Sequence, residues 1–141
     1  MLRPVSLFFA LAALSVATSC GDGGQTSQNR ASAPPLTLEE QGRKAFAACA
    51  ICHSVKDPGA PGYTTMVGPS LFRVAGAPAG HVSSYNYSNA MRESGLIWDD
   101  ATLDAFIENP QMIVPRSRMA FAGEKNAERR AAIIAYLKTL E

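Results

Sequence analysis

The sequence predicts an all-α domain of about four or five helices, and three observations support this class. Thr37-Leu38-Glu39-Glu40 is a capping box, in which the hydroxyl and the carboxylate three residues on can each accept from a backbone amide at the helix start. The segment from about 126 to 140 carries apolar residues at helical spacing. No segment shows the convincing alternation of apolar and polar residues that a half-buried strand requires.

Length and charge limit the classes of function. The chain has 141 residues, which is enough for one domain of ordinary size. It has 13 Lys and Arg residues against 12 Asp and Glu residues, and Arg3 alone accounts for the formal net charge of +1. Without a basic excess, nucleic-acid binding has no electrostatic support.

Residues 1–19 read as an export signal. Arg3 gives the positive start, and the apolar run over 5–17 is too short for a membrane span of about 20 residues. Cys20 follows the small residues 17–19, which resembles a bacterial lipoprotein processing site, although Ala17 stands where that pattern favours Leu. We expect acyl chains on Cys20 to anchor the protein at a membrane, and plain cleavage before Cys20 is the alternative.

Residues 20–35 are expected to be a flexible tether, because Gly, Ser, Thr, Gln, Asn and Pro dominate and no apolar periodicity is present. The folded domain is expected over 36–141. Its first helix begins after Thr37 and runs through Phe46. Gly42 lies on the same face as Phe46, and its helix-propensity cost of about 1 kcal/mol suggests that another helix packs closely there.

Proline and glycine mark loops from 54 to 67 and again up to about 84. A short helix is expected after Tyr87, with Ser88 as its N-cap and Gly95 as its stop. Asp99 or Asp100 caps the next helix, which carries Leu103, Phe106 and Ile107 and which Pro110 ends. An extended loop over 114–123 precedes the final helix, whose apolar stripe is expected to comprise Ala131, Ile134, Leu137 and either Ile133 or Tyr136.

The pentapeptide Cys49-Ala50-Ile51-Cys52-His53 carries the strongest chemical signal. Two thiols three positions apart followed by His is the spacing for covalent attachment of haem c, with the imidazole as proximal iron ligand. A redox Cys-x-x-Cys pair would follow a strand in a βαβ unit, and none is predicted here. A structural zinc site needs four ligands, but Cys20 is distant and the chain has only 3 Cys and 2 His. A plain disulfide needs no His.

Several side chains could occupy the sixth position of the iron: Met66, Met91, Met112, Met119 and His81. Met119 lies on an irregular loop between Pro115 and Gly123, so it is free to point at a buried iron. Packing roles are favoured for Met91, within a helix, and for Met66, beside a turn. Met112 can equally fill the core, and a solvated loop position is favoured for His81.

A further set of motifs occurs in order along the chain: Cys49-Ala-Ile-Cys52-His53, Gly68-Pro69-Ser-Leu71, Tyr85-Asn-Tyr87, Trp98, Asn109-Pro110, Met119-Ala-Phe-Ala-Gly123 and Ile134-Ala-Tyr136-Leu137-Lys. With them the chain resembles a class I cytochrome c, of the mitochondrial and bacterial respiratory kind, over essentially all of 36–141. The resemblance implies helices wrapped around one covalent haem, with the N- and C-terminal helices crossing.

The resemblance also implies the site. His53 and Met119 are the axial pair, and the carbonyl of Pro69 accepts from the distal ring nitrogen of His53. Tyr87 and Trp98 match positions whose OH and indole N–H donate to a buried propionate, although simple aromatic packing is their alternative role.

Other matches concern support of the haem. Gly42 and Phe46 match the face that crosses the last helix near Leu137, and Ser117 matches a hydroxyl that helps to hold the Met loop.

The chain departs from this pattern at three places. Phe106 stands where the family usually has a Tyr whose hydroxyl approaches the Met sulfur. Ala77 stands where mitochondrial members carry an Arg facing a propionate. The loop over 54–67 is longer than in the mitochondrial form and is more like that of bacterial members.

A closed iron with two protein ligands implies a single-electron carrier. The export signal places this carrier on the periplasmic side of a bacterial membrane, and we expect a monomer. The implied donor is a respiratory quinol-oxidising cytochrome complex and the acceptor a terminal oxidase or similar. One alternative is a small-ligand-binding haem sensor or peroxidase-like cytochrome in which Met119 dissociates, and Phe106 is compatible with it. A second alternative is a non-haem interaction module, for example one linked by zinc.

Overall fold

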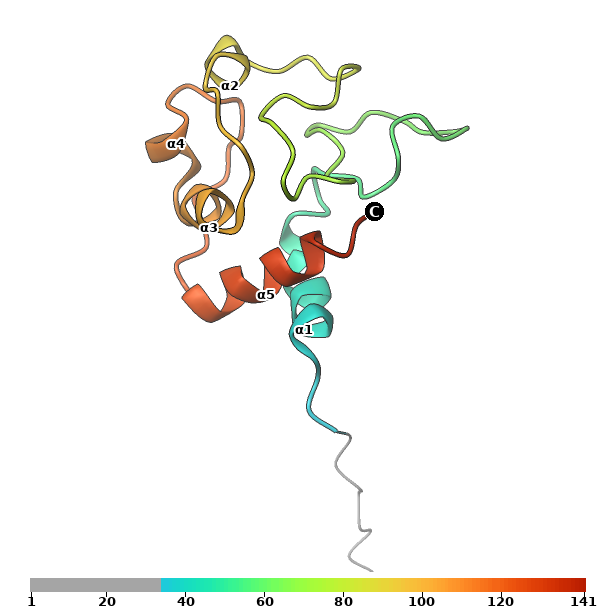
Figure 1. The fold of residues 1–141 in the computed structure, drawn as a ribbon, viewed down its shortest axis with the longest axis vertical. Coiled ribbons are helices and arrows are strands. Elements are labelled where there is room, and N and C mark those ends of the chain that lie inside the picture. Colours follow the sequence, from blue (N-terminus) through green and yellow to red (C-terminus); the bar gives the residue numbers. More distant parts are fainter. Residues whose placement is uncertain (1–33) are drawn as a thin grey trace, which may run out of the picture. The chain divides into compact units, whose positions relative to one another are not determined.

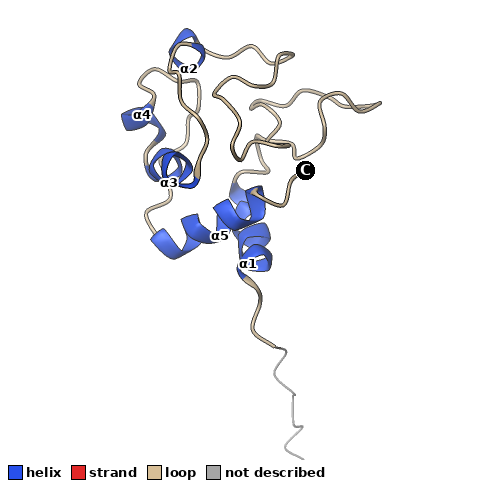
Figure 2. Ribbon diagram, viewed as in Figure 1, coloured by secondary structure: helices blue, strands red, loops and turns tan. Residues whose placement is uncertain are grey.

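The computed structural model describes residues 34–141, shown as a ribbon in Figures 1 and 2. The predicted signal over 1–19, Cys20 and the tether up to residue 33 lie outside the described residues. The helices are α1 (Leu38–Ala45), α2 (Asn89–Arg92), α3 (Asp100–Glu108), α4 (Pro110–Ile113) and α5 (Ala127–Leu137), with a 3-10 turn η1 (Phe46–Ala48) after α1. Over 34–141 the only β feature is an isolated bridge between Pro78 and Ile97, so the all-α prediction is confirmed.

The first and last helices cross, as Figure 1 shows for α1 and α5. The capping box forms at the start of α1, where the Thr37 amide donates to Glu40 at 2.8 Å and the Glu40 amide donates to Thr37 at 3.2 Å. Gly42 is buried at the crossing, and a Cβ there would lie 1.9 Å from the carbonyl oxygen of Ala132. The predicted close approach at Gly42 is therefore confirmed.

The buried stripe of α5 differs by one position from the prediction. Ala131 is exposed, whereas Ala132, Ile133, Ile134 and Leu137 are buried. Ala131 was therefore wrongly placed in the stripe, because the tight contact with Gly42 turns Ala132 toward α1. Tyr136 is half-buried and packs edge-on against Phe46, with ring centroids 5.2 Å apart.

Helix α3 is joined to α5 through a buried arginine. The Arg130 guanidinium donates from Nε to Asp104 at 2.8 Å and from a second nitrogen at 3.2 Å. It also donates to the carbonyls of Glu124 and Lys125, both at 3.1 Å. One side chain thus connects α3, α5 and the loop that precedes α5.

The segment after α3 contains a helix that the sequence pattern does not predict. Asp99 caps α3, which ends at Glu108, and Pro110 then begins α4 instead of leading directly into a loop. Proline is well accommodated in a first turn because its missing amide would have no helical partner there. Met112, on α4, is 73% exposed, so it does not fill the core.

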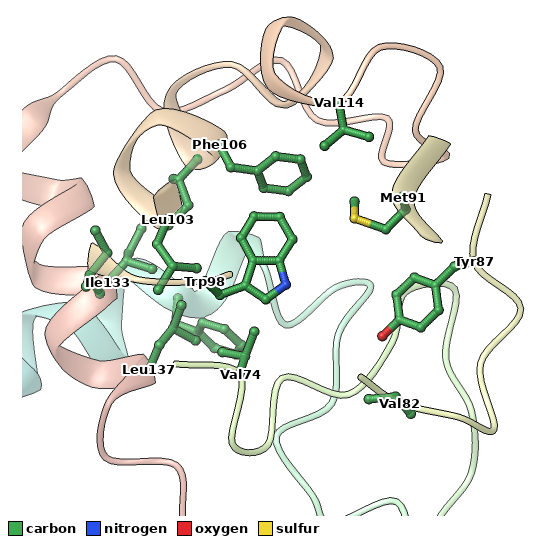
Figure 3. Packing of buried hydrophobic residues seen from close by; sticks show 13 residues of the cluster. Val74, Val82, Tyr87, Met91, Trp98, Leu103, Phe106, Val114, Ile133 and Leu137 are labelled. Carbon is green, nitrogen blue, oxygen red and sulfur yellow. The ribbon is translucent and has the colours of Figure 1, made fainter. Parts of the chain in front are cut away.

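Trp98 lies at the centre of the buried apolar cluster shown in Figure 3. Its ring packs against Phe106 of α3 at a centroid distance of 4.8 Å. The other labelled members come from α2, α3, α5 and the loops: Val74, Val82, Tyr87, Met91, Leu103, Val114, Ile133 and Leu137. Helices α2 and α3 begin as expected, after Ser88 and Asp99, while α2 ends at Arg92, three residues before Gly95.

Candidate haem-binding site

The Cys-x-x-Cys-His segment continues the direction of η1 as a single turn. The Cys52 and His53 amides both donate to the Cys49 carbonyl, at 3.0 and 2.9 Å. Both thiols are free and half-buried, and burial raises the pKa of the Cys49 thiol. The two sulfurs are thus held one helical turn apart in a rigid segment, which is the arrangement that attachment to one porphyrin edge requires.

His53 is oriented by the backbone after Gly68. Its Nδ1 lies 2.8 Å from the Pro69 carbonyl oxygen, so Nδ1 carries the proton that is donated and Nε2 keeps a lone pair for a metal. Burial lowers the pKa of His53, although the bond to Pro69 opposes this effect, and the neutral ring that metals bind is favoured.

Gly68 makes this orientation possible. Its amide donates to the Cys52 carbonyl at 2.8 Å, which fixes the segment against the cysteine motif. A Cβ on Gly68 would lie 2.5 Å from Cε1 of the His53 ring, so no side chain fits without displacing the imidazole. The structure therefore brings Cys52, His53 and Pro69 together as the resemblance implies.

Tyr87 and Trp98 are buried and face each other in Figure 3, with the phenol hydroxyl and the indole nitrogen on the facing sides. Within 34–141 no hydrogen bond involves the Trp98 indole N–H. Burial raises the pKa of Tyr87, an interaction with the Val82 backbone lowers it, and the neighbouring phenols of Tyr85 and Tyr63 raise it further. Tyr87 is therefore kept protonated as a donor, and both side chains lie within the buried apolar cluster.

The hydroxyl of Tyr63 is buried and has no hydrogen-bond partner among the described residues. An unpaired buried hydroxyl is costly, so its presence beside Tyr87 indicates a polar group that is bound there. The two thiols, the imidazole with a free nitrogen, and the hydroxyl of Tyr63 and indole N–H of Trp98 fit a haem that carries carboxylates. The sequence analysis did not single out Tyr63, and only the unusual length of its loop could have drawn attention to it.

His81 does not occupy the solvated position that was expected. Its Nδ1 is buried without a partner among the described residues, and its Nε2 lies 3.3 Å from the Phe72 carbonyl oxygen. The reason is tertiary: the Ala79 amide donates to the Leu96 carbonyl at 2.8 Å, and this contact draws the loop inward.

Met119 is half-buried and packs against the apolar cluster. Of the other methionines, Met91 is buried in α2, in agreement with its predicted packing role. Met66 is 38% exposed, so the packing role predicted for it is wrong. It is followed by Val67, whose carbonyl accepts from the Tyr85 hydroxyl at 2.6 Å.

The loop that carries Met119 is fixed at its start by Gln111. The Gln111 side-chain nitrogen donates to the Ser117 carbonyl at 3.1 Å, to the Ser117 hydroxyl at 3.2 Å and to the Met119 carbonyl at 3.1 Å. The Arg116 amide donates to the Gln111 side-chain oxygen at 3.1 Å. Ser117 was expected to help hold this loop, whereas Gln111 was missed because an exposed Gln carries no motif.

Contacts with α3 fix the end of the same loop. Gly123 has φ +95°, and a Cβ there would lie 2.0 Å from the Glu108 carbonyl oxygen. The Glu124 amide donates to the Ile107 carbonyl at 2.9 Å. Arg118 also donates to the Asn86 carbonyl at 2.7 Å, which joins the loop to the segment that carries Tyr87.

The departures at Phe106 and Ala77 have local structural explanations. The Phe106 ring is buried against Trp98 and offers no hydroxyl to the Met loop. The Ala77 carbonyl accepts from the Trp98 amide at 2.9 Å, so the backbone of Ala77 supports Trp98 although its side chain supplies no charge. Arg92 and Arg118 instead donate to the carbonyls of Tyr87 and Asn86, which places two cations on this segment.

Comparison with known proteins gives one consistent answer. The cytochrome c family profile matches residues 39–141. The chain is 46% identical to cytochrome c2 of Rhodomicrobium vannielii over 99 residues, covering 70% of this chain and 76% of that protein. It is 42% identical to cytochrome c of Euglena viridis over 103 residues, or 72% of this chain and 96% of that protein. Among solved structures, cytochrome cH from Methylobacterium extorquens superposes with a TM-score of 0.65 at 39% identity, covering 72% and 97% of the two chains.

Proposed function

This chain belongs to the cytochrome c family, and we propose that it is an exported, membrane-tethered electron carrier with His53 and Met119 as the axial ligands of its iron. Membership of this family establishes a cytochrome c fold, a covalent haem c and a role in electron transfer. The observation that best supports ligation by His53 is the hydrogen bond between its Nδ1 and the Pro69 carbonyl, because this bond fixes the ring and leaves Nε2 free to bind iron.

Haem c, when bound, supplies an iron that takes up and releases one electron. In the proposal Cys49 and Cys52 hold the haem covalently and His53 binds on the proximal side. The close contact of the ring with Gly68 and its bond to Pro69 limit rotation of the imidazole. A ligand that barely moves between oxidation states keeps the structural change on electron transfer small.

Met119 is proposed as the second axial ligand. Its loop is fixed at both ends, by Gln111 and by Gly123, and its side chain packs against the core instead of extending into solvent. A thioether favours ferrous iron and raises the reduction potential. With both axial positions taken by protein, iron has no position open for a substrate.

Tyr87 and Trp98 are proposed as donors to a buried haem propionate. The raised pKa of Tyr87 and the indole N–H of Trp98, which has no partner among the described residues, support this role. Both groups keep their proton at neutral pH and can therefore donate it in a hydrogen bond. The unpaired hydroxyl of Tyr63 belongs to a phenol close enough to Tyr87 to raise its pKa further.

We further propose export to the periplasm and anchoring through acylated Cys20. Over 34–141, none of the helices has both the length and the apolarity needed to cross a membrane. Expression with the Cys20→Ala substitution tests the anchor: the protein should move from the membrane fraction to the soluble periplasmic fraction with its haem retained. Recovery of both forms in the soluble fraction would contradict anchoring.

The proposed donor is a quinol-oxidising cytochrome complex and the proposed acceptor a terminal oxidase or similar. Arg116, Arg118 and Lys125 give the Met loop a modest basic rim, while the whole chain has a formal net charge of only +1. A tether raises the effective concentration of a partner, so electrostatic steering matters less. Turnover should therefore depend weakly on salt, and a steep fall in rate with added salt would contradict this.

Optical spectra of the purified protein in both redox states test the ligation. A covalent haem c spectrum with the weak long-wavelength Met–Fe(III) band is expected, and Met119→Ala should abolish the band. If the band persists in Met119→Ala, the assignment of Met119 is wrong. Rapid binding of carbon monoxide to the reduced wild-type protein at neutral pH would favour the sensor or peroxidase alternative.

A further inference from the structure

We propose that Gln111 is the positioning residue that keeps the Met119 loop in its ligand-binding conformation. The inference rests on the proposed ligation by Met119. It concerns a side chain of α4 that the resemblance assigns no role and that lies outside the loop it contacts.

The base of this contact is rigid. Pro110 is fully buried at the start of α4, and Asn109 caps the helix by accepting from the Met112 amide at 3.3 Å. Val114, 2% exposed, ends the helix with its amide donating to the Pro110 carbonyl at 2.9 Å. Gln111 therefore projects from an anchored turn, and its own position does not depend on the loop.

Both ends of the Gln111 amide are used, and they are used differently. The oxygen accepts from the Arg116 amide, while the nitrogen donates to Ser117 and to the Met119 carbonyl. Rotating the amide by half a turn would place its N–H groups against the Arg116 N–H and its oxygen against two carbonyls. The observed orientation is therefore the only one that satisfies the loop, and no other side-chain type offers the same donor and acceptor pair at this length, since Asn is shorter by one methylene.

The loop needs such a contact because of two of its own features. Arg116 has φ +65°, a conformation that is costly for a residue with a side chain. Phe106 provides no hydroxyl on the core side of the loop. The bond from the Arg116 amide to Gln111 holds the strained residue in place, and the bond to the Met119 carbonyl fixes the backbone of the ligand itself.

Replacement of Met119 by added imidazole on the ferric protein measures how firmly the loop is held. Its rate, followed as a Soret shift by stopped flow, should rise about tenfold in Gln111→Leu, which has similar size but no polar atoms. Gln111→Glu keeps the acceptor for Arg116 but sets a carboxylate against two carbonyls, so it should also accelerate the exchange. Met112→Ala is the matched control, because Met112 lies on the same short helix, is 73% exposed and makes no side-chain hydrogen bond within 34–141.

Two further measurements distinguish positioning of the Met119 loop by Gln111 from a general contribution of Gln111 to stability. Arg116→Gly removes the strain, so adding it to Gln111→Leu should return the exchange rate most of the way to that of the wild type. Global unfolding of Gln111→Leu in denaturant should stay near that of the wild type, since Gln111 is exposed and lies outside the core.

Each outcome decides something. An exchange rate in Gln111→Leu equal to that of the wild type, or an equal acceleration in Met112→Ala, would overturn the proposal for Gln111 and leave Met119 ligation intact. Failure of Arg116→Gly to slow the exchange would overturn the link to backbone strain. Absence of the Met–Fe(III) band from the wild-type protein would overturn the ligation and the role of Gln111 together.

Discussion

Gly42→Ala should destabilise the protein although alanine is the better helix former. The new Cβ would lie 1.9 Å from the Ala132 carbonyl oxygen, whereas ordinary contacts begin at 3.4 Å, so α1 would have to move by about 1.5 Å. A gap of about 0.5–1 Å between packed atoms already removes a quarter to a half of the dispersion energy of each contact across an interface. The obstacle is backbone of α5, which cannot rotate away as a side chain could.

The magnitude follows from two opposing effects. Overpacking in a core costs about 1–3 kcal/mol, and a backbone clash belongs at the upper end of that range. Alanine returns about 1 kcal/mol through helix propensity. We expect a net loss of about 2 kcal/mol in the free energy of unfolding, or a fall in melting temperature of about 10 °C for a domain of this size.

Equilibrium unfolding of the ferric holoprotein in guanidinium, followed by far-UV circular dichroism, measures this change. Gly59→Ala is the matched control, because its backbone is not left-handed and the nearest atom to its added Cβ is an Asp57 side-chain oxygen at 3.4 Å. The control should stay within about 0.5 kcal/mol of the wild type. If Gly42→Ala also falls within that range, the crossing of α1 and α5 is not as tight as described.

Three further predictions concern the haem side, the α3–α5 contact and pH. Gly68→Ala should displace the His53 ring, since its Cβ would lie 2.5 Å from Cε1, and should lower the free energy of unfolding of the holoprotein by about 1–3 kcal/mol. An unchanged reduction potential and melting temperature would show that Gly68 does not hold the ring in place. Arg130→Met should lower the melting temperature clearly more than Arg129→Ala. The Arg130 side chain is 8% exposed and donates two hydrogen bonds to Asp104, whereas the Arg129 side chain is 62% exposed. Equal effects of the two substitutions would contradict this. The pKa of Asp99 is lowered mainly by its hydrogen bonds from Thr102, so its cap contributes stability above the ordinary carboxyl pKa that is lost as pH falls through the lowered value. In melting temperatures measured from about pH 5 to 2, Asp99→Asn should reduce the slope, and an unchanged slope would rule out this contribution.

Several features were predictable because their physics is local. The caps at Thr37, Ser88 and Asp99 each satisfy the amide three residues along the chain, so the order of residues alone identifies them. The spacing of Cys49, Cys52 and His53 is likewise readable from the chain, since one helical turn sets the distance between the thiols. Gly42 was informative because a glycine in a helix interior needs a packing reason, and the reason is Ala132.

Other features depend on partners distant in the chain. The shift of the α5 stripe from Ala131 to Ala132 follows from the α1 crossing, and periodicity alone does not fix the phase of a helix to one residue. The inward position of His81 results from the bond between Ala79 and Leu96. Tyr63 was not singled out because burial of its hydroxyl depends on how a long loop folds back.

The sequence by itself determined the cofactor, the helical class and the family, because a five-residue motif and short-range caps carry that information. The tertiary structure decided how the site is held: the imidazole against Gly68 and Pro69, and the Met119 loop between Gln111 and Gly123. The physical reason is that a ligand's identity is a property of one residue. Its rigidity is a property of the separate segments whose hydrogen bonds converge on it.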